Sequence, residues 1–550
     1  MKRIQKLILC TSILFIQCNL VNAERTPNLV IIFVVDQFAY RTMQKLQKYM
    51  EGGIKFLLRN GLNFTNAYHP HAMPATATGH TALNTGTFAK EHGIIGNRWF
   101  DTNGISIKCD DDHAEHAAVF GPTGPYTYGK SAKNIMVDGI SDQIILASQP
   151  HAPKMVFSIS LKSRAAIACA GKLGKALWFD EESGNFTSSK AYFNTLPEWV
   201  TVFNNNKNIG GIRKIHWPYA LRPNHPAYRF THEKDYRFTA GKQLVGKTIP
   251  VGKEYEHFQQ TPEAMQLTLD CAKKCIDIHY RRTESSTLVV WISLSTPDKI
   301  GHNYGQESLE LIDCLYHLDK QLKSFMHWVS TKTNERLTLY ALTADHGAAP
   351  IPELMKERGI HHAHRFVYSK EVKKLNEHIK QHFGIEKLIY DFKSPCFFLN
   401  EKKLHALKRS DKKRLIKEIK DFLLEQPAIK QVWTRDELEN PAYACTDIAA
   451  LFKNQIYPKR SGYIFIQPYP YSFASEYPNG AAHRSPYEYD THVPLVLYQR
   501  NKIGNRTIND KVYTTQFANT LAHILEVPKP SASTFNMLPG IVNECTIGCY

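Results

Sequence analysis

The 550-residue chain has few of the features that mark fibrous, repetitive or membrane-embedded proteins. Its 30 glycines and 28 prolines are near average usage, which excludes collagen-like and low-complexity chains. A mean hydropathy of −0.36 excludes a polytopic membrane protein. No repeat of solenoid length, no C-x-x-C pair and no RRM or helix-turn-helix motif is present. We therefore expect a globular protein with a large core and no specific nucleic-acid partner.

Cysteine is scarce as well. Nine of the 11 cysteines follow residue 23, and an odd number leaves at least one thiol unpaired in a monomer. The Cys545-x₃-Cys549 spacing at the tail would suit a disulfide in an oxidising compartment, and the sequence leaves this pairing open.

Long hydrophobic runs are absent except at the start of the chain. Lys2, Arg3 and Lys6 precede the apolar run 7–16, and small residues end the segment at Ala23. This pattern predicts a secretory signal peptide cleaved after Ala23. A membrane anchor is the alternative, but the run is too short for a bilayer core of about 30 Å. We expect a periplasmic or secreted protein with no transmembrane segment after cleavage.

Positive charge exceeds negative charge along the chain. The 68 Lys and Arg against 51 Asp and Glu give a net charge of +17, and signal cleavage lowers it to about +14. Such a balance favours anionic substrates or surfaces, although it also fits non-specific adhesion to nucleic acid.

Short β-branched apolar runs alternate with helical patterns. The helical patterns cover Pro262–His279 and Ser308–Trp328. This alternation predicts an α/β fold with a doubly wound, mostly parallel central sheet and helices on both faces. The runs expected to be buried parallel strands are Asn28–Val35, Met155–Leu161, Thr287–Leu294, Leu337–Leu342 and Val493–Tyr498.

A Lys-rich, mostly helical segment interrupts this pattern. We expect a signal peptide at 1–23, an α/β core at 24–358, an inserted cap at 359–480, and a return to the core with a C-terminal tail at 481–550. Within the cap, Lys412–Leu424 has apolar residues at helical spacing with Lys and Arg between them. A basic patch for an acidic partner is one interpretation, and the solvated face of an amphipathic helix is the favoured one.

Three of the predicted strands end near a carboxylate. Asp36, Asp298 and Asp345 occupy these positions, and ligands bind outside the carboxyl ends of strands in open α/β sheets. His302 lies four residues after Asp298, and His346 directly follows Asp345. Carboxylate and imidazole donors suit Zn²⁺ best, with Mn²⁺ or Fe as alternatives. The combination predicts a metal site at this edge.

A threonine-rich turn supplies a candidate nucleophile. Residues 73–81 read as a loop that enters a helix, and the helix N-terminus favours negative charge. A threonine that touches a metal there could become an alkoxide and attack an electrophile.

At this point several motifs, in one order, resemble a known family. The chain is similar to the alkaline phosphatase superfamily, and most closely to its bacterial PafA-type, phosphate-irrepressible phosphatases with a threonine nucleophile. The resemblance covers about residues 28 to 525. The motifs are Val34-Val35-Asp36-Gln37, Thr76-x-x-Gly79-His80, His92-Gly93-Ile94 with Gly96-Asn97, Ser160–Arg164, Asp298-x₃-His302, Thr343–Gly347 and His483–Tyr487.

The resemblance implies two zinc ions per chain and a covalent mechanism. Thr76 would form a phosphothreonine, and a water would then release inorganic phosphate. Asn97, Lys162 and Arg164 would contact the non-transferred phosphoryl oxygens; the two cations are two residues apart after a strand, and extended geometry would point both the same way. The implied ligands are Asp36, Thr76, Asp345 and His346 for one zinc, and Asp298, His302 and His483 for the other.

The resemblance leaves two residue assignments with rivals. Thr76 is favoured because it lies four residues before His80, and Thr78 is the alternative if the turn has slipped. His492 is the rival of His483 for the last ligand place. The remaining conspicuous histidines, which we interpret as structural or solvent-exposed, are His80, His92, His361, His362 and His364.

The resemblance predicts an alkaline phosphatase acting on small phosphate monoesters, and a monomer. The main alternative is a two-zinc phosphodiesterase or nucleotide pyrophosphatase of the same superfamily. Lys162 and Arg164 favour the monoester, whose dianion carries more charge to neutralise. A sulfatase is excluded because no C/S-x-P-x-R segment exists, and a non-catalytic binding protein would be expected to lack Thr76 or a ligand.

Overall fold

The computed structural model describes residues 26–121, 129–207, 214–230, 245–248, 254–282, 285–442, 446–476 and 479–541. The predicted signal peptide and the Cys545–Cys549 pair lie outside these ranges. No helix in the described ranges is long and apolar enough to cross a membrane. The described cysteines, all buried and with free thiols, are Cys109, Cys169, Cys271, Cys275, Cys314 and Cys396.

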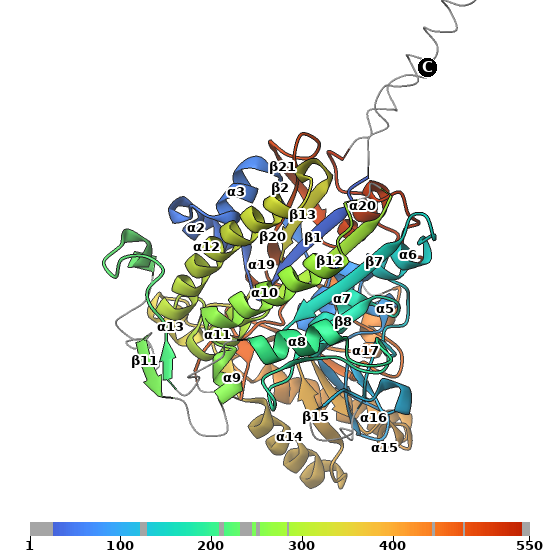
Figure 1. Ribbon diagram of the computed structural model, residues 1–550. Coiled ribbons are helices and arrows are strands. Elements are labelled where there is room, and N and C mark those ends of the chain that lie inside the picture. Colours follow the sequence, from blue (N-terminus) through green and yellow to red (C-terminus); the bar gives the residue numbers. More distant parts are fainter. Residues whose placement is uncertain are drawn as a thin grey trace, which may run out of the picture.

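A mixed nine-stranded sheet forms the centre of the described fold, in the order β21-β2-β20-β13-β1-β12-β7-β8-β9 (Figure 1). Strand β1 lies between β12 and β13 and is parallel to both. The expected α/β fold is therefore confirmed. The strands are β1 (Leu29–Val35), β2 (Leu62–Tyr68), β7 (Lys154–Ser160), β8 (Lys175–Phe179), β9 (Phe186–Thr187), β12 (Thr287–Leu294), β13 (Thr338–Thr343), β20 (His492–Gln499) and β21 (Arg506–Tyr513).

One of the five expected parallel strands runs the other way. Strand β20 contains residues 493–498 but is antiparallel to both of its neighbours, β13 and β2. The apolar run predicts burial correctly, yet a fully buried strand reads the same in either direction. Because β20 is reversed, its first residue, His492, lies at the sheet edge where the parallel strands end.

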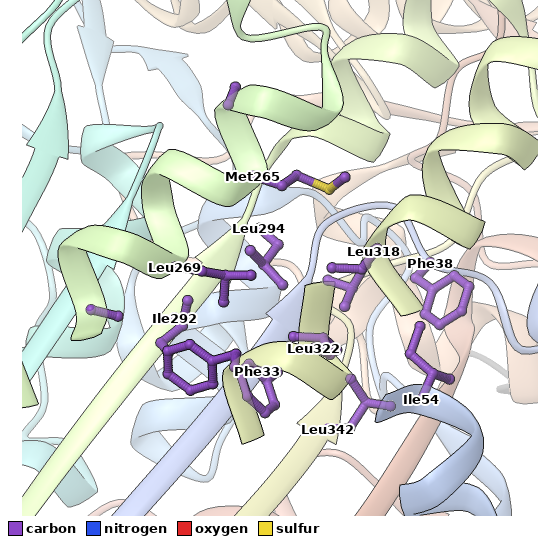
Figure 2. Close-up of a cluster of buried hydrophobic side chains, with 14 of the residues drawn as sticks. Phe33, Phe38, Ile54, Met265, Leu269, Ile292, Leu294, Leu318, Leu322 and Leu342 are labelled. Atoms are coloured by element: carbon purple, nitrogen blue, oxygen red, sulfur yellow. The ribbon is translucent and has the colours of Figure 1, made fainter. Parts of the chain in front are cut away.

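Hydrophobic residues fill both faces of the sheet. Along β1, Phe33 belongs to one buried cluster and its neighbour Ile32 to the other, because successive strand residues point to opposite faces. Figure 2 shows Phe33 in one cluster with Leu269 and Leu322, which come from two long helices. Helices therefore cover both faces, as expected for a doubly wound fold. On the Phe33 side they include α3 (Gly53–Asn60), α10 (Pro262–His279) and α12 (Leu309–Lys332), and on the other side α6 (Ile140–Leu146) and α20 (Gln516–Ile524).

The Lys-rich segment contains a sheet of its own, so it is less helical than the sequence suggests. Its four strands lie in the order β15-β16-β18-β17 and run antiparallel. Figure 1 shows β15 at one end of the molecule with α14, α15 and α16. The strands are β15 (Ile389–Lys393), β16 (Cys396–Leu399), β17 (Ile429–Thr434) and β18 (Ile464–Pro468), and the helices are α14 (Tyr368–Phe383), α15 (Glu401–His405), α16 (Arg409–Leu424), α17 (Arg435–Glu439) and α18 (Asp447–Lys453).

Helix α16 has the amphipathic character predicted for 412–424. Leu415, Ile419 and Leu423 are buried in the core of the small sheet, at spacings of four. The Lys and Arg between them lie on the other face, as in a solvated amphipathic helix.

Short elements complete the described fold. The remaining helices are α2 (Tyr40–Leu46), α4 (Thr76–Thr85), α5 (Ala89–His92), α7 (Ser163–Ala170), α8 (Glu198–Asn206), α9 (Glu254–Phe258), α11 (Thr296–Tyr304), α13 (Pro352–Glu357) and α19 (Glu488–Thr491). The remaining strands are β3 (Arg98–Phe100), β4 (Ser106–Lys108), β5 (Asp111–Asp112), β6 (Gly129–Lys130), β10 (Lys214–His216), β11 (Val245–Thr248), β14 (Arg365–Phe366) and β19 (Phe473–Ala474).

Candidate active site

The three acidic residues predicted at strand ends meet at one edge of the sheet. Val35 of β1 is in register with Leu294 of β12, and Val34 with Thr343 of β13. The chain therefore leaves all three strands at the same level, which brings Asp36, Asp298 and Asp345 together. All three carboxylates are buried.

Histidine side chains complete two groups of potential metal ligands. In one group, ligand atoms of Asp298, His346 and His483 lie within 4.8 Å of one another; in the other, those of Asp36, Asp345 and His346 do so. His302, on α11 with Asp298, places its Nε2 3.2 Å from Asp298 Oδ1. The structure thus brings together every carboxylate and imidazole that the resemblance implies as a ligand.

Backbone carbonyls orient the three imidazoles. The Nδ1 atoms of His302, His346 and His483 lie 3.0, 2.8 and 2.8 Å from the carbonyl oxygens of Ala481, Gly347 and Pro74, respectively. A carbonyl only accepts, so each Nδ1 donates and each Nε2 keeps its lone pair for the site. Metal-binding histidines are usually fixed in this way.

Unpaired buried atoms show that these residues suit a cation. Neither Asp36 Oδ1 nor His346 Nε2 has a hydrogen-bond partner in the described structure, although both atoms are buried and 3.4 Å apart. Burial and the Asp298 carboxylate raise the pKa of Asp36 well above its usual value. Burial lowers the pKa of His346, so its imidazole is neutral and able to coordinate. Neutral imidazoles beside crowded carboxylates are a donor set that fits Zn²⁺.

The Lys162 ammonium lies among these carboxylates. Its Nζ donates to Asp36 Oδ2 at 2.6 Å and also to Asp298 Oδ2, and it lies 3.4 Å from the hydroxyl oxygen of Thr76. Burial opposes its charge, but the carboxylates of Asp298 and Asp36 outweigh that effect and raise the pKa of Lys162. A cation is therefore held beside the candidate nucleophile.

Thr76 is the first residue of α4, where the sequence predicts a helix start. Asn97 Oδ1 accepts a hydrogen bond from the backbone N–H of Ala77 at 2.9 Å, which ties Asn97 to this helix start. Thr78 points elsewhere: its Oγ1 accepts from the N–H of Ala75 at 2.9 Å, as a helix cap. Thr76 is thus the threonine whose hydroxyl lies beside Lys162.

The extended geometry expected for Lys162 and Arg164 is wrong. Strand β7 ends at Ser160 and α7 begins at Ser163, so Lys162 is the N-cap and Arg164 lies in the first helical turn. A turn, not the strand pleat, sets their relative direction. The Nε of Arg164 is buried without a hydrogen-bond partner in the described structure.

Gln37 and Ser293 support the site in roles that the sequence does not predict. The Gln37 side chain donates to Asp298 Oδ1 at 2.7 Å, and its backbone N–H donates to Asp345 Oδ1 at 3.2 Å. Ser293, on β12, has its Oγ 2.8 Å from His80 Nε2. A single serine in a buried strand, such as Ser293, does not indicate a functional role in the sequence. Gln37 indicates one only through its position after Asp36.

His80 supports the site rather than joining the ligand groups. Its Nδ1 lies 2.8 Å from the Thr76 carbonyl oxygen and 3.2 Å from Asp345 Oδ2. Burial opposes ionisation of Asp345, but His346 and His80 outweigh it and lower the pKa of that carboxyl. The spacing of four residues between Thr76 and His80 on one helix was the sequence feature that could have indicated this contact.

The structure separates the remaining histidines from the ligand groups. His492 stacks on Tyr40 and Tyr68, with ring centroids 4.3 and 4.5 Å apart, and its Nε2 lies 2.7 Å from the Thr65 carbonyl oxygen. His92 is buried, and its Nδ1 accepts from the N–H of Ile94. His361 and His362 are exposed, and His364 is half-buried.

Asp490 positions the loop that carries His483. Its Oδ2 accepts from the backbone N–H and the hydroxyl of Ser485 at 2.8 and 2.6 Å, while its Oδ1 has no partner in the described structure. The Asp490 side chain is fully buried. Burial raises the pKa of Asp490 to about 8.

This shift predicts how stability depends on pH. The native state holds the Asp490 proton more tightly than the unfolded chain, where the pKa is about 3.9. The stabilisation is complete below about pH 4 and is lost as pH rises through about 8. Relative to Asp490→Asn, the wild-type free energy of unfolding should fall by up to about 1.4 kcal/mol per pH unit across that range. Urea unfolding of both proteins at several pH values measures this slope, and a pH-independent difference would contradict it.

Comparison with known proteins shows the family of this chain. The model of the type I phosphodiesterase / nucleotide pyrophosphatase family matches residues 30–487. The chain is 29% identical over 544 residues to alkaline phosphatase PafA of Elizabethkingia meningoseptica, covering 95% of this chain and 96% of that protein. It is 26% identical to alkaline phosphatase PhoV of Synechococcus elongatus, covering 96% and 98%.

Solved structures give the same result for the fold. A crystal structure of wild-type alkaline phosphatase PafA superposes with a TM-score of 0.79 at 26% identity, covering 95% of this chain and all of that one. The family match spans most of the chain, including every candidate ligand. The chain therefore belongs to the type I phosphodiesterase / nucleotide pyrophosphatase family, within the alkaline phosphatase superfamily.

Proposed function

We propose that this protein is an alkaline phosphatase, which hydrolyses phosphate monoesters with two zinc ions per chain and a phosphothreonine intermediate. The observation that carries the proposal is the position of the Lys162 ammonium, 3.4 Å from Thr76 Oγ1 and in contact with Asp36 and Asp298. A monoester dianion needs such a cation next to the attacking oxygen. The named relatives, all similar over nearly their whole length, include alkaline phosphatases PafA and PhoV.

In the first half-reaction the Thr76 oxygen attacks phosphorus. The Thr76 hydroxyl loses its proton as the new bond joins its Oγ to phosphorus, the ester P–O bond breaks, and the leaving alkoxide takes up a proton. In the second half-reaction a water oxygen attacks phosphorus, the phosphothreonine bond breaks, and Thr76 regains its proton as inorganic phosphate departs. The helix N-terminus at Thr76 favours the negative charge of both steps.

The zinc ions, when bound, would lower the pKa of a bound hydroxyl and stabilise the attacking and leaving oxygens. Asp36, Asp345 and His346, with Thr76, would hold one, and Asp298, His302 and His483 the other. The carbonyl-bound imidazoles and the unpaired Asp36 Oδ1 support this assignment.

Asn97, Lys162 and Arg164 are the proposed contacts to the non-transferred phosphoryl oxygens. The unpaired buried Nε of Arg164 and the proximity of Lys162 to Thr76 support these roles. Since Asn97 already binds the helix start at Ala77, its amide is held beside the nucleophile with its N–H groups available.

A two-zinc phosphodiesterase or nucleotide pyrophosphatase is the second candidate, favoured by the description of the matching family. The two reactions differ in the charge of the substrate, since a diester carries one negative charge fewer. The deciding experiment compares kcat/KM for an aryl phosphate monoester and the matching diester at alkaline pH. A monoester preference of several orders of magnitude supports the phosphatase, and a diester preference supports the second candidate.

The two cations should separate these substrates further. Lys162→Ala and Arg164→Ala are each expected to lower kcat/KM for the monoester by about 10²-fold, because each removes one charge-assisted contact to the dianion. The diester should lose less than about tenfold. Lys299→Ala is the matched control, because it also removes a lysine charge. Lys299 forms an ion pair with Glu181 at 2.8 Å and is not one of the proposed substrate contacts. Equal losses of kcat/KM on both substrates would contradict the proposed contacts of Lys162 and Arg164 with the phosphoryl oxygens.

The proposal also includes three properties of the whole protein. It is exported, it is a monomer, and residues 359–480 form an inserted cap. The apolar start of the sequence supports export to the periplasm or beyond, with cleavage after Ala23. The separate hydrophobic cluster of the small sheet supports the cap as a unit. Small phosphate monoesters are the proposed substrates, in keeping with the positive net charge.

A further inference from the structure

A cavity of about 530 Å³ lies between α3, α12, β13 and β20, and none of its lining residues belongs to the candidate active site. It is near the amino-terminal end of β13, whereas Asp345 follows the other end of that strand. Cavities of this size are typical of small-molecule sites.

Two tyrosines form an aromatic floor. Tyr340 of β13 and Tyr498 of β20 are directly paired in the antiparallel register, so both side chains project from the same face of the sheet. Phe56 of α3 packs edge-on against Tyr498, with ring centroids 5.1 Å apart. Neither tyrosine hydroxyl makes a hydrogen bond within the described part of the chain, and both line the cavity. Tyr340 is only 6% exposed and its ring is stacked with Phe33, so the ring surface for stacking comes from Tyr498 and from Phe56, which is 40% exposed.

The wall formed by α3 is fixed in place. Asp319 of α12 accepts hydrogen bonds from the backbone N–H groups of Glu51, Gly52 and Lys55, at 2.9, 2.6 and 3.1 Å. Gly52 is required here, because a Cβ would collide with the Asp319 backbone. The start of α3 is therefore pinned to α12, which leaves the cavity preformed rather than collapsible.

The charges around the cavity cancel. Arg500 forms an ion pair with Glu335, and the remaining charged lining residues, Glu51 and Lys323, have opposite signs. An anionic ligand would gain little here, in contrast to the cationic catalytic site. We propose that this cavity binds an uncharged heteroaromatic molecule of nucleoside size, which stacks on Tyr498 beside Phe56 and hydrogen-bonds to a tyrosine hydroxyl.

Equilibrium dialysis of the full chain with adenosine tests this site. Wild type should bind one adenosine per chain, saturably, and inorganic phosphate should not displace it, because phosphate belongs to the other site. Ser330→Trp fills the cavity from α12, and Tyr498→Ala removes half of the floor; each should weaken binding at least tenfold. Leu146→Ala, a change at a residue that is 66% exposed and far from the cavity lining, should leave binding unchanged.

The result does not depend on the proposed phosphatase activity. Thr76→Ala should bind adenosine as wild type does. If Ser330→Trp or Tyr498→Ala fails to fold, Phe56→Ala decides, because that side chain is 40% exposed. No saturable binding, full displacement by phosphate, or equal affinity in the folded cavity variants would each overturn the proposal.

Discussion

Thr76→Ala should lower kcat for an aryl phosphate monoester by about 10³-fold or more, because it removes the oxygen that attacks phosphorus. Metal content should stay near two zinc ions per chain, since the carboxylates and imidazoles that would hold them are unchanged. Steady-state kinetics and elemental analysis of the same samples measure both quantities.

Thr78→Ala is the matched control for this prediction. The Thr78 hydroxyl accepts from the N–H of Ala75 and lies 2.9 Å from the Met73 carbonyl oxygen, whereas the Thr76 hydroxyl oxygen lies 3.4 Å from Lys162 Nζ. Loss of the Thr78 hydroxyl should cost about 1 kcal/mol of stability and leave kcat within a few fold of wild type. If Thr78→Ala abolished activity while Thr76→Ala did not, the nucleophile assignment would be reversed.

Removal of metal by a chelator should lower kcat/KM by about 10³-fold, and added zinc should restore it. The same treatment should lower the Tm. Without the metal ions, Lys162 is the cation that contacts Asp36 and Asp298. Burial and the carboxylates of Asp298 and Asp345 then outweigh Lys162 and raise the pKa of Asp36. A metal present at about 1,000 times its Kd stabilises the native state by about 4 kcal/mol.

Two histidine variants locate the metal. His302→Asn should lower the zinc content from two to about one per chain and depress activity, because His302 Nε2 lies 3.2 Å from Asp298 Oδ1. His492→Asn should change neither, because His492 is stacked on two tyrosines and bound to the Thr65 carbonyl. Full activity in chelated protein, or zinc loss on the His492 change, would contradict the proposed ligand set.

The sequence by itself predicted the strands and the acids that end them. Apolar runs such as 287–294 are long enough and β-branched enough to indicate buried strands in any context. Asp36 follows such a run directly and Asp345 comes two residues after β13, and their local position already indicates the edge where ligands bind. Helix α10 was predicted with its observed bounds, because its apolar period and Pro262 at the first position are local signals.

Only the tertiary structure decided properties that depend on partners far along the chain. The reversed direction of β20 follows from its neighbours β2 and β13. The roles of Gln37 and Ser293 depend on contacts with residues more than 200 positions away. Strand geometry was expected around Lys162, but the chain turns there and α7 begins at Ser163.

The sequence therefore determined which chemical groups this protein has and on which local elements they lie, because propensity and periodicity act over a few residues. The fold decided which of those groups meet: His483 and not His492 joins the carboxylates, and Thr76 and not Thr78 faces Lys162. These choices depend on angles and registers between distant segments, which side-chain packing fixes and which no single stretch of sequence encodes.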